Sequence, residues 1–231
     1  MGYKIKRILV GTQQVRPAGR LPSAYQEVEY IENNGTAYIL TWLNIKDWYR
    51  NLIKVRFLVA ANADTYPWIS WWYLWPDSWL SWWHGRFYLN WLQTNWRLNY
   101  WYLGNYWDIW SWLTTWTDYE IDYSWISWNA FVKLNWTTLQ SSSATYSTSN
   151  PWIATVWWWT HMDQSEWNQY RANPWIRIYY SKFYNSAWTL VRNFIPCYRK
   201  SDSVIWLYDL VNNQFYTNSW SWTFTKWPDV N

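Results

Sequence analysis

The sequence has little glycine, and tryptophan is present in its place. At the ordinary frequency of about 7%, a chain of this length should contain about 16 glycines, yet it has 6, together with 30 tryptophans in 231 residues. The two residues are unevenly placed. Residues 1–41 hold four glycines and no tryptophan, whereas the rest of the chain holds two glycines and all 30 tryptophans. This exchange indicates that many tryptophans occupy positions suited to glycine.

Other scarcities exclude several kinds of site. The single cysteine, Cys197, allows neither an internal disulfide nor a cysteine-based metal site. The two histidines, His84 and His161, have no carboxylate or cysteine at zinc-ligand spacing. Four aspartates considered as calcium ligands are scattered, without the spacing of a calcium loop: Asp108, Asp118, Asp163 and Asp209. No glycine-rich phosphate loop is present, even with glycine at every tryptophan. We expect no metal and no cofactor.

Charge and hydrophobic runs limit the partners. A net charge of +4 is too small to indicate nucleic acid binding. No run approaches the ~20 apolar residues of a membrane span once the tryptophan clusters are discounted. The apolar run at residues 8–10 is too short for a signal peptide. We therefore expect no membrane insertion, and synthesis and assembly in a cytoplasm.

Tryptophan stands where turns need glycine. Asn135-Trp136 separates two strand-like runs, where Asn-Gly would form a type I′ hairpin turn. Trp75-Pro76-Asp77 and Trp227-Pro228-Asp229 have the composition of turns. Ser186-Ala187-Trp188 joins two further strand-like runs. Trp136 is therefore expected at a hairpin turn with a positive φ.

The strain in such positions is large compared with the stability of a domain. A non-glycine residue in the left-handed region costs roughly 1–2 kcal/mol, so ten such positions would cost about 10–20 kcal/mol, against a whole-domain stability of about 5–15 kcal/mol. We hypothesise that the gene uses TGA for glycine and has been translated with TGA as tryptophan. The alternative is a genuinely tryptophan-rich protein that stacks on carbohydrate.

The periodicity is that of an all-β protein. Residues 52–59 alternate apolar and basic side chains, and Tyr119, Ile121 and Tyr123 alternate with Glu120 and Asp122. We expect the first three to face the core and the two carboxylates to point to solvent. No convincing helical stripe occurs. Further strands are expected at residues 86–90, 97–103, 129–134, 137–140, 176–185 and 189–199. Long loops are expected at residues 64–85, 104–117 and 152–175.

Both ends of the chain resemble one family. Residues 21–42, LPSAYQEVEYIENNGTAYILTW, match the outline LPxxYxxVEYIExxGTxYIxTG, and residues 204–230 match its closing segment if tryptophan is replaced by glycine. The family is the concanavalin A-like (laminin-G-like) β-sandwich domain of bacteriophage tail and structural proteins. The resemblance implies a two-sheet antiparallel jelly-roll sandwich over residues 21–231. It also implies a non-catalytic virion protein, in the tail or in receptor binding, that binds a host-surface glycan.

Residues 1–20 are expected to form a separate arm. They carry Lys4, Lys6, Arg7, Arg16 and Arg20, and the first acidic residue is Glu27. A basic segment with a short apolar run can add a strand to the sheet edge of another virion protein. The arm is therefore predicted to attach the domain to the particle. The alternative is that residues 3–10 form an edge strand of the same sandwich.

Two alternative functions follow from the residues. One is an architectural virion decoration protein that binds no sugar. The other is a degenerate glycoside hydrolase, because Glu120 and Asp122 fit part of the E-x-D-x-E or E-x-D-x-x-E pattern, although Ser124 and Trp125 supply no partner carboxylate. We expect no catalytic residues. Exposed tyrosines offer contact area with a hydrogen-bonding tip, and the candidates for glycan binding are Tyr66, Tyr73, Tyr102, Tyr106 and Tyr170.

Overall fold

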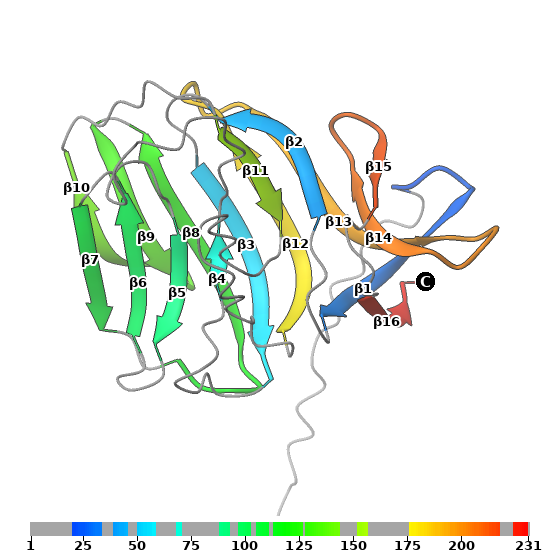
Figure 1. Ribbon diagram of the computed structural model, residues 1–231, viewed down its shortest axis with the longest axis horizontal. Helices are drawn as coiled ribbons and strands as arrows, with labels where there is room; N and C mark the ends of the chain where they lie inside the picture. The colour runs from blue at the N-terminus through cyan, green and yellow to red at the C-terminus, as the bar shows by residue number, and fades with distance from the viewer. Residues whose placement is uncertain are drawn as a thin grey trace, which may run out of the picture.

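The described part of the chain is built entirely from antiparallel β-strands. The computed structural model describes residues 20–33, 39–45, 50–58, 68–70, 88–92, 97–102, 105–110, 113–126, 128–143, 152–156, 176–217 and 224–230. Figure 1 shows the strands arranged in two layers. Within these ranges no helix is long and apolar enough to cross a membrane.

The larger layer is a single sheet in the order β10-β9-β8-β3-β12-β1-β13-β14-β15, with β16 paired to β1. It brings together strands that lie far apart in sequence. Its strands are β1 (Tyr25–Asn33), β3 (Arg50–Phe57), β8 (Asp118–Ile126), β9 (Asn129–Leu134), β10 (Thr137–Ser142), β12 (Ile176–Tyr184), β13 (Leu190–Arg199), β14 (Ile205–Asp209), β15 (Gln214–Tyr216) and β16 (Phe224–Asp229).

The second layer contains two smaller sheets that touch through β4 and β11 (Figure 1). One consists of β4 (Trp68–Ser70), β5 (Tyr88–Leu92), β6 (Arg97–Tyr102) and β7 (Asn105–Trp110), and the other of β2 (Ile39–Ile45) and β11 (Trp152–Val156). The chain crosses between the layers along β1–β2–β3–β4, at β7–β8 and again along β10–β11–β12. This connectivity confirms the predicted all-β, two-sheet antiparallel jelly-roll sandwich.

The core lies between the layers and follows the predicted alternation. Val55 of β3 and Ile121 of β8 are fully buried, and both belong to one cluster with Ile39 of the second layer. Tyr119 and Tyr123 also face this core, as predicted. Burying an aliphatic side chain of this size contributes about 1.5–3 kcal/mol. Apolar contact between the two inner faces therefore holds the layers together.

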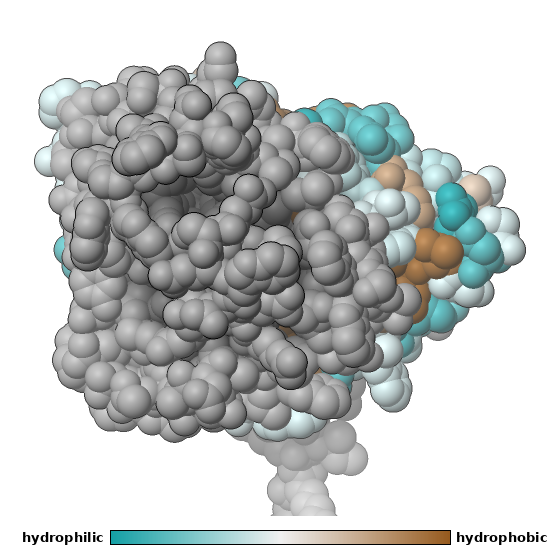
Figure 2. Space-filling model, in the orientation of Figure 1, coloured by the Kyte–Doolittle hydropathy of each residue, from teal (hydrophilic) through white to brown (hydrophobic). Residues whose placement is uncertain are grey.

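A second apolar cluster lies on the opposite face of the large sheet, where β13 and β14 project beyond the second layer. Ile195, Cys197 and Tyr208 are buried there, and the ring of Tyr25 lies 5.1 Å from that of Tyr208. Burial raises the pKa of the Cys197 thiol well above its ordinary value. Figure 2 shows hydrophobic residues at this projecting end, bordered by hydrophilic ones.

The turns place tryptophan in the left-handed region. Leu134 pairs with Thr137, which leaves a two-residue turn with a φ of 46° at Asn135 and 70° at Trp136. These two positive values are those of the predicted type I′ turn, so the expectation for Trp136 is confirmed. Four of the seven non-glycine residues with positive φ in the described ranges are tryptophans: Trp116, Trp128, Trp136 and Trp188. All four are exposed.

The predictions of three loops and one turn are wrong. Strands β4, β7 and β11 lie within the predicted loops at residues 64–85, 104–117 and 152–175. Treating tryptophan as glycine removed strand-favouring aromatic residues from these windows. Trp227-Pro228-Asp229 ends β16 and is not a turn, because proline is tolerated on a strand that pairs on one side only. Trp75-Pro76-Asp77 lies outside the described residues.

Candidate functional site

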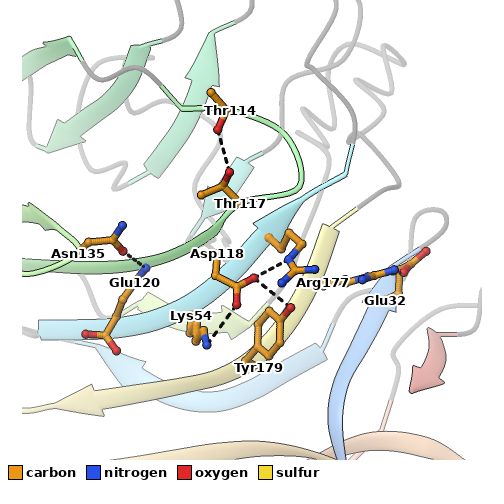
Figure 3. Close-up of polar contacts among 10 residues, drawn as sticks. Glu32, Lys54, Thr114, Thr117, Asp118, Glu120, Asn135, Arg177 and Tyr179 are labelled. Atoms are coloured by element: carbon orange, nitrogen blue, oxygen red, sulfur yellow. Dashed lines mark hydrogen bonds and ion pairs between the residues drawn. The ribbon is translucent and has the colours of Figure 1, made fainter. Parts of the chain in front are cut away.

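The outer face of the large sheet, turned away from the core, carries charged and aromatic side chains on β3, β8, β9 and β12. Glu120 is opposite Lys54 of β3, and Asp118 is opposite Arg56. Asp118, Glu120 and Asp122 occupy every second position of β8, so their side chains lie on the same face of the sheet. Figure 3 shows Asp118 directed toward Lys54 and Tyr179. This face is the candidate functional site.

Asp118 is held by three neighbours. Its carboxylate accepts bonds from Arg56 Nε at 2.5 Å and from the Tyr179 hydroxyl at 3.1 Å, and Lys54 Nζ lies 3.3 Å away (Figure 3). Burial raises the pKa of Asp118, but the Arg56 hydrogen bond and the charges of Lys54 and Arg56 outweigh it and hold the pKa below the ordinary 3.8. The same surroundings raise the pKa of Tyr179, chiefly through burial. Asp118 therefore stays ionised.

Glu120 and Asp122 are directed away from the core, but they are not solvated as expected. Asp122 is 2% exposed and forms a bidentate pair with Arg50, with Nε–Oδ1 at 2.6 Å and Nη2–Oδ2 at 2.7 Å. Glu120 Oε2 accepts a hydrogen bond from the Tyr180 hydroxyl. Glu120 Oε1 is buried and has no hydrogen bond within the described residues. Solvent exposure is therefore wrong for Asp122, which Arg50 of β3 covers, and only partial for Glu120, which is half-buried beside Tyr180 of β12.

The remaining part of the hydrolase pattern is unsupported. Ser124, where the pattern needs a carboxylate, is buried, and its hydroxyl accepts a bond from the Ile126 amide. In the described ranges no carboxylic acid is bonded to Glu120, and no group of three or more His, Cys, Asp or Glu side chains is placed to hold a metal. Asp209 is buried and accepts the amides of Asn193 and Val211 at 2.8 and 3.0 Å. It therefore stabilises the β13–β14–β15 turns.

The tyrosines chosen as glycan contacts are not brought together by any described feature. Tyr66, Tyr73 and Tyr170 lie outside the described residues, as do His84, His161 and Asp163. Tyr102 and Tyr106 belong to the paired strands β6 and β7, so Tyr106 is on a strand and not in a loop as predicted. The five remain sequence-based candidates.

A group of aromatic and basic side chains, called the aromatic corner, was not predicted from the sequence. The Arg50 guanidinium lies 4.8 Å from the ring centre of Tyr184 and 5.4 Å from that of Trp188. The Trp188 indole stacks on Phe131 at 6.2 Å and 13°, and Lys133 Nζ lies 4.4 Å from the Phe131 ring centre. These residues come from three strands and one turn, so only the cross-strand register brings them together.

These features define an all-β, two-layer antiparallel sandwich with a charged and aromatic outer face. No family model matches the chain, and no curated protein matches it. Among solved structures, domains LG4-5 of the mouse laminin alpha1 chain are similar, with a TM-score of 0.44 and 11% identity over 71% of this chain and 42% of that chain. The chain thus spans less than half the length of the laminin structure, and the similarity concerns the fold.

Acid should weaken the Asp118 cluster. Because the folded-state pKa of Asp118 is lowered, its contribution to stability is present above about pH 4 and is lost as the pH falls through the folded value. We expect Asp118→Asn to reduce the loss of stability between about pH 5 and pH 2, measured by urea unfolding at each pH. Glu29→Gln, the same charge change at an exposed position of β1, is the control. Identical acid sensitivity in Asp118→Asn and the unsubstituted chain contradicts the prediction.

Proposed function

We propose that the chain is a virion-associated protein of the tail or receptor-binding apparatus, and that its sandwich binds a host-surface glycan without catalysis. One observation carries the proposal. The two segments that resemble the phage domain family include strands β1 and β16, which pair directly, with Val28 opposite Asp229 and Tyr30 opposite Trp227. The two segments that carry the family resemblance are therefore neighbours in the sheet, where the first strand of the domain pairs with the last.

The absence of catalysis is supported by the surroundings of Asp118 and Asp122. A glycoside hydrolase needs a proton donor with a raised pKa. The surroundings of Asp118 lower its pKa, and both oxygens of Asp122 are bonded by Arg50. Neither residue suits the role of general acid.

A glycan array with the purified full chain tests the proposal. Binding to a defined set of glycans, with no release of reducing sugar from them, is the expected result. A chain that joins the particle but binds no glycan supports the architectural alternative, and release of reducing sugar supports the hydrolase. Either outcome overturns the proposed function.

The basic arm, residues 1–20, is proposed to attach the domain to other virion proteins. The described residues begin at the end of the arm. There Arg20 forms an ion pair with Glu27, and Leu21 packs against the second apolar cluster. Deletion of residues 1–20 should leave a folded domain that no longer joins the particle, as judged by circular dichroism and co-sedimentation. Unfolding on deletion favours an edge strand of the sandwich.

We further propose that the native protein has glycine at the 30 tryptophan positions. None of the six tryptophans whose exposure is described is fully buried, and four have a φ of 61–70°. Trp206, which is half-buried, has an indole Nε1 with no hydrogen bond partner among the described residues. The codons should be TGA, and peptide mass spectrometry of the native product should find glycine. TGG codons throughout contradict the proposal.

A further inference from the structure

Trp188 lies over the outer face of the large sheet, between Phe131 and Arg50, and the space that its indole occupies is called the slot. Its indole is stacked on Phe131 and lies beside the Arg50 guanidinium, yet the side chain remains 39% exposed. Its φ of 61° is one that glycine adopts without strain. With glycine at position 188, the space taken by the indole is open to solvent.

The residues around the slot are held in place by contacts that do not involve the indole. The turn that carries Trp188 is held by Asn185, whose Oδ1 accepts the amides of Ala187 and Thr189 at 3.0 Å each, while its carbonyl accepts the Trp188 amide at 2.9 Å. Arg50 is fixed by both oxygens of Asp122 and lies over Tyr184. Replacing the indole by a hydrogen atom therefore leaves the walls in position.

The slot combines one apolar surface with positive charge. The Phe131 ring supplies a flat apolar wall, which suits the apolar face of a ring-shaped ligand. Two neighbouring rows of side chains cross the sheet beneath it, and together they hold three cations and one carboxylate. The rows are Tyr184–Arg50–Ser124–Phe131 and Lys182–Leu52–Asp122–Lys133.

We propose that this slot is the glycan subsite and that it binds a pyranose carrying a carboxylate, with Trp188 imitating the sugar ring in the chain as written. The inference rests on the proposed glycan-binding function and on glycine at position 188. The sugar ring stacks on Phe131 in place of the indole. Its carboxylate is attracted by Lys133 and by Arg50, whose Nη1 is not used in the pair with Asp122.

The test compares full-length chains that differ at one position. One chain has glycine at all 30 positions, a second keeps Trp188 alone, and a third keeps Trp136 alone as a control with a similar φ in another turn. The probes are a glucuronate-containing oligosaccharide and its neutral glucose counterpart. We expect Trp188 to weaken binding of the acidic probe by about ten-fold or more, and Trp136 to leave binding unchanged. If the all-glycine chain does not fold, the same comparison is made in the chain as written, with Trp188→Gly or Trp136→Gly as single substitutions. Trp188→Gly should then strengthen binding of the acidic probe, and Trp136→Gly should leave it unchanged.

Further variants separate the slot from the wider function. Lys133→Gln in the all-glycine chain should reduce the preference for the acidic over the neutral probe by about ten-fold. Equal binding with and without Trp188 overturns the subsite while leaving glycan binding in place. If neither the two probes nor a glycan array gives binding with any chain, both the subsite and the proposed function fail.

Discussion

Replacing Trp116, Trp128, Trp136 and Trp188 together by glycine should raise the free energy of unfolding by about 2–4 kcal/mol. Each residue has a positive φ, which costs a non-glycine residue about 1–2 kcal/mol. Part of the gain is offset because glycine loses about 0.5–1 kcal/mol more backbone entropy on folding. Equilibrium unfolding in urea measures the change, as a shift of the midpoint with an unchanged slope.

Two control substitutions show whether φ is the cause. Asn213→Gly removes a residue that also has a positive φ, but asparagine tolerates the left-handed region, so little change is expected. Trp227→Gly removes an exposed tryptophan from strand β16, where glycine weakens the strand. Stabilisation by Trp227→Gly equal to that at the four turn positions would show that loss of exposed indole, and not relief of strain, is responsible.

Arg50→Met should destabilise the protein by about 3–5 kcal/mol, because it leaves a buried carboxylate without its partner. Asp122 is 2% exposed and both its oxygens are bonded to Arg50. The double substitution Arg50→Met with Asp122→Leu should recover most of the loss, since an apolar pair of similar volume needs no compensating charge. Urea unfolding of the two single variants and the double variant gives the coupling energy.

The exposed pair of Arg199 and Asp202 is the matched control. It is also bidentate, with Arg199 Nε 3.0 Å from Asp202 Oδ1 and Nη2 2.5 Å from Oδ2, but solvent screens it. Arg199→Met should therefore change stability little. A similar loss in Arg50→Met and Arg199→Met would mean that burial of Asp122 does not determine the result.

Alternation and turn chemistry were enough to predict much of the large sheet. The run at residues 52–59 corresponds to β3, and the hairpin of β9 and β10 closes at Asn135-Trp136 as expected. These features are local, because side-chain period and turn type depend on neighbouring residues. In the second layer, the expected strands at residues 86–90 and 97–103 correspond to β5 and β6, whereas β4, β7 and β11 were missed because their tryptophans were discounted as glycine.

The aromatic corner depends on contacts that no local pattern reveals. Phe131 and Trp188 are separated by 57 positions, and they meet because β9, β8, β3 and β12 are neighbours in that order. The same order explains why Asp122 is covered and not solvated. A sequence pattern gives the face of a strand, whereas the neighbouring strand determines what lies over it.

The pairing of β1 has a consequence for folding during synthesis. Its partners are β12, β13 and β16, and the first of them begins at Ile176. At about 5–20 residues per second, a ribosome needs roughly 7–30 s to translate from the end of β1 to that point. During this interval β1 exposes backbone groups that can pair with other nascent chains. Glu27, Glu29 and Glu32 within β1 place negative charge along it, which keeps newly made copies apart until the last strands emerge.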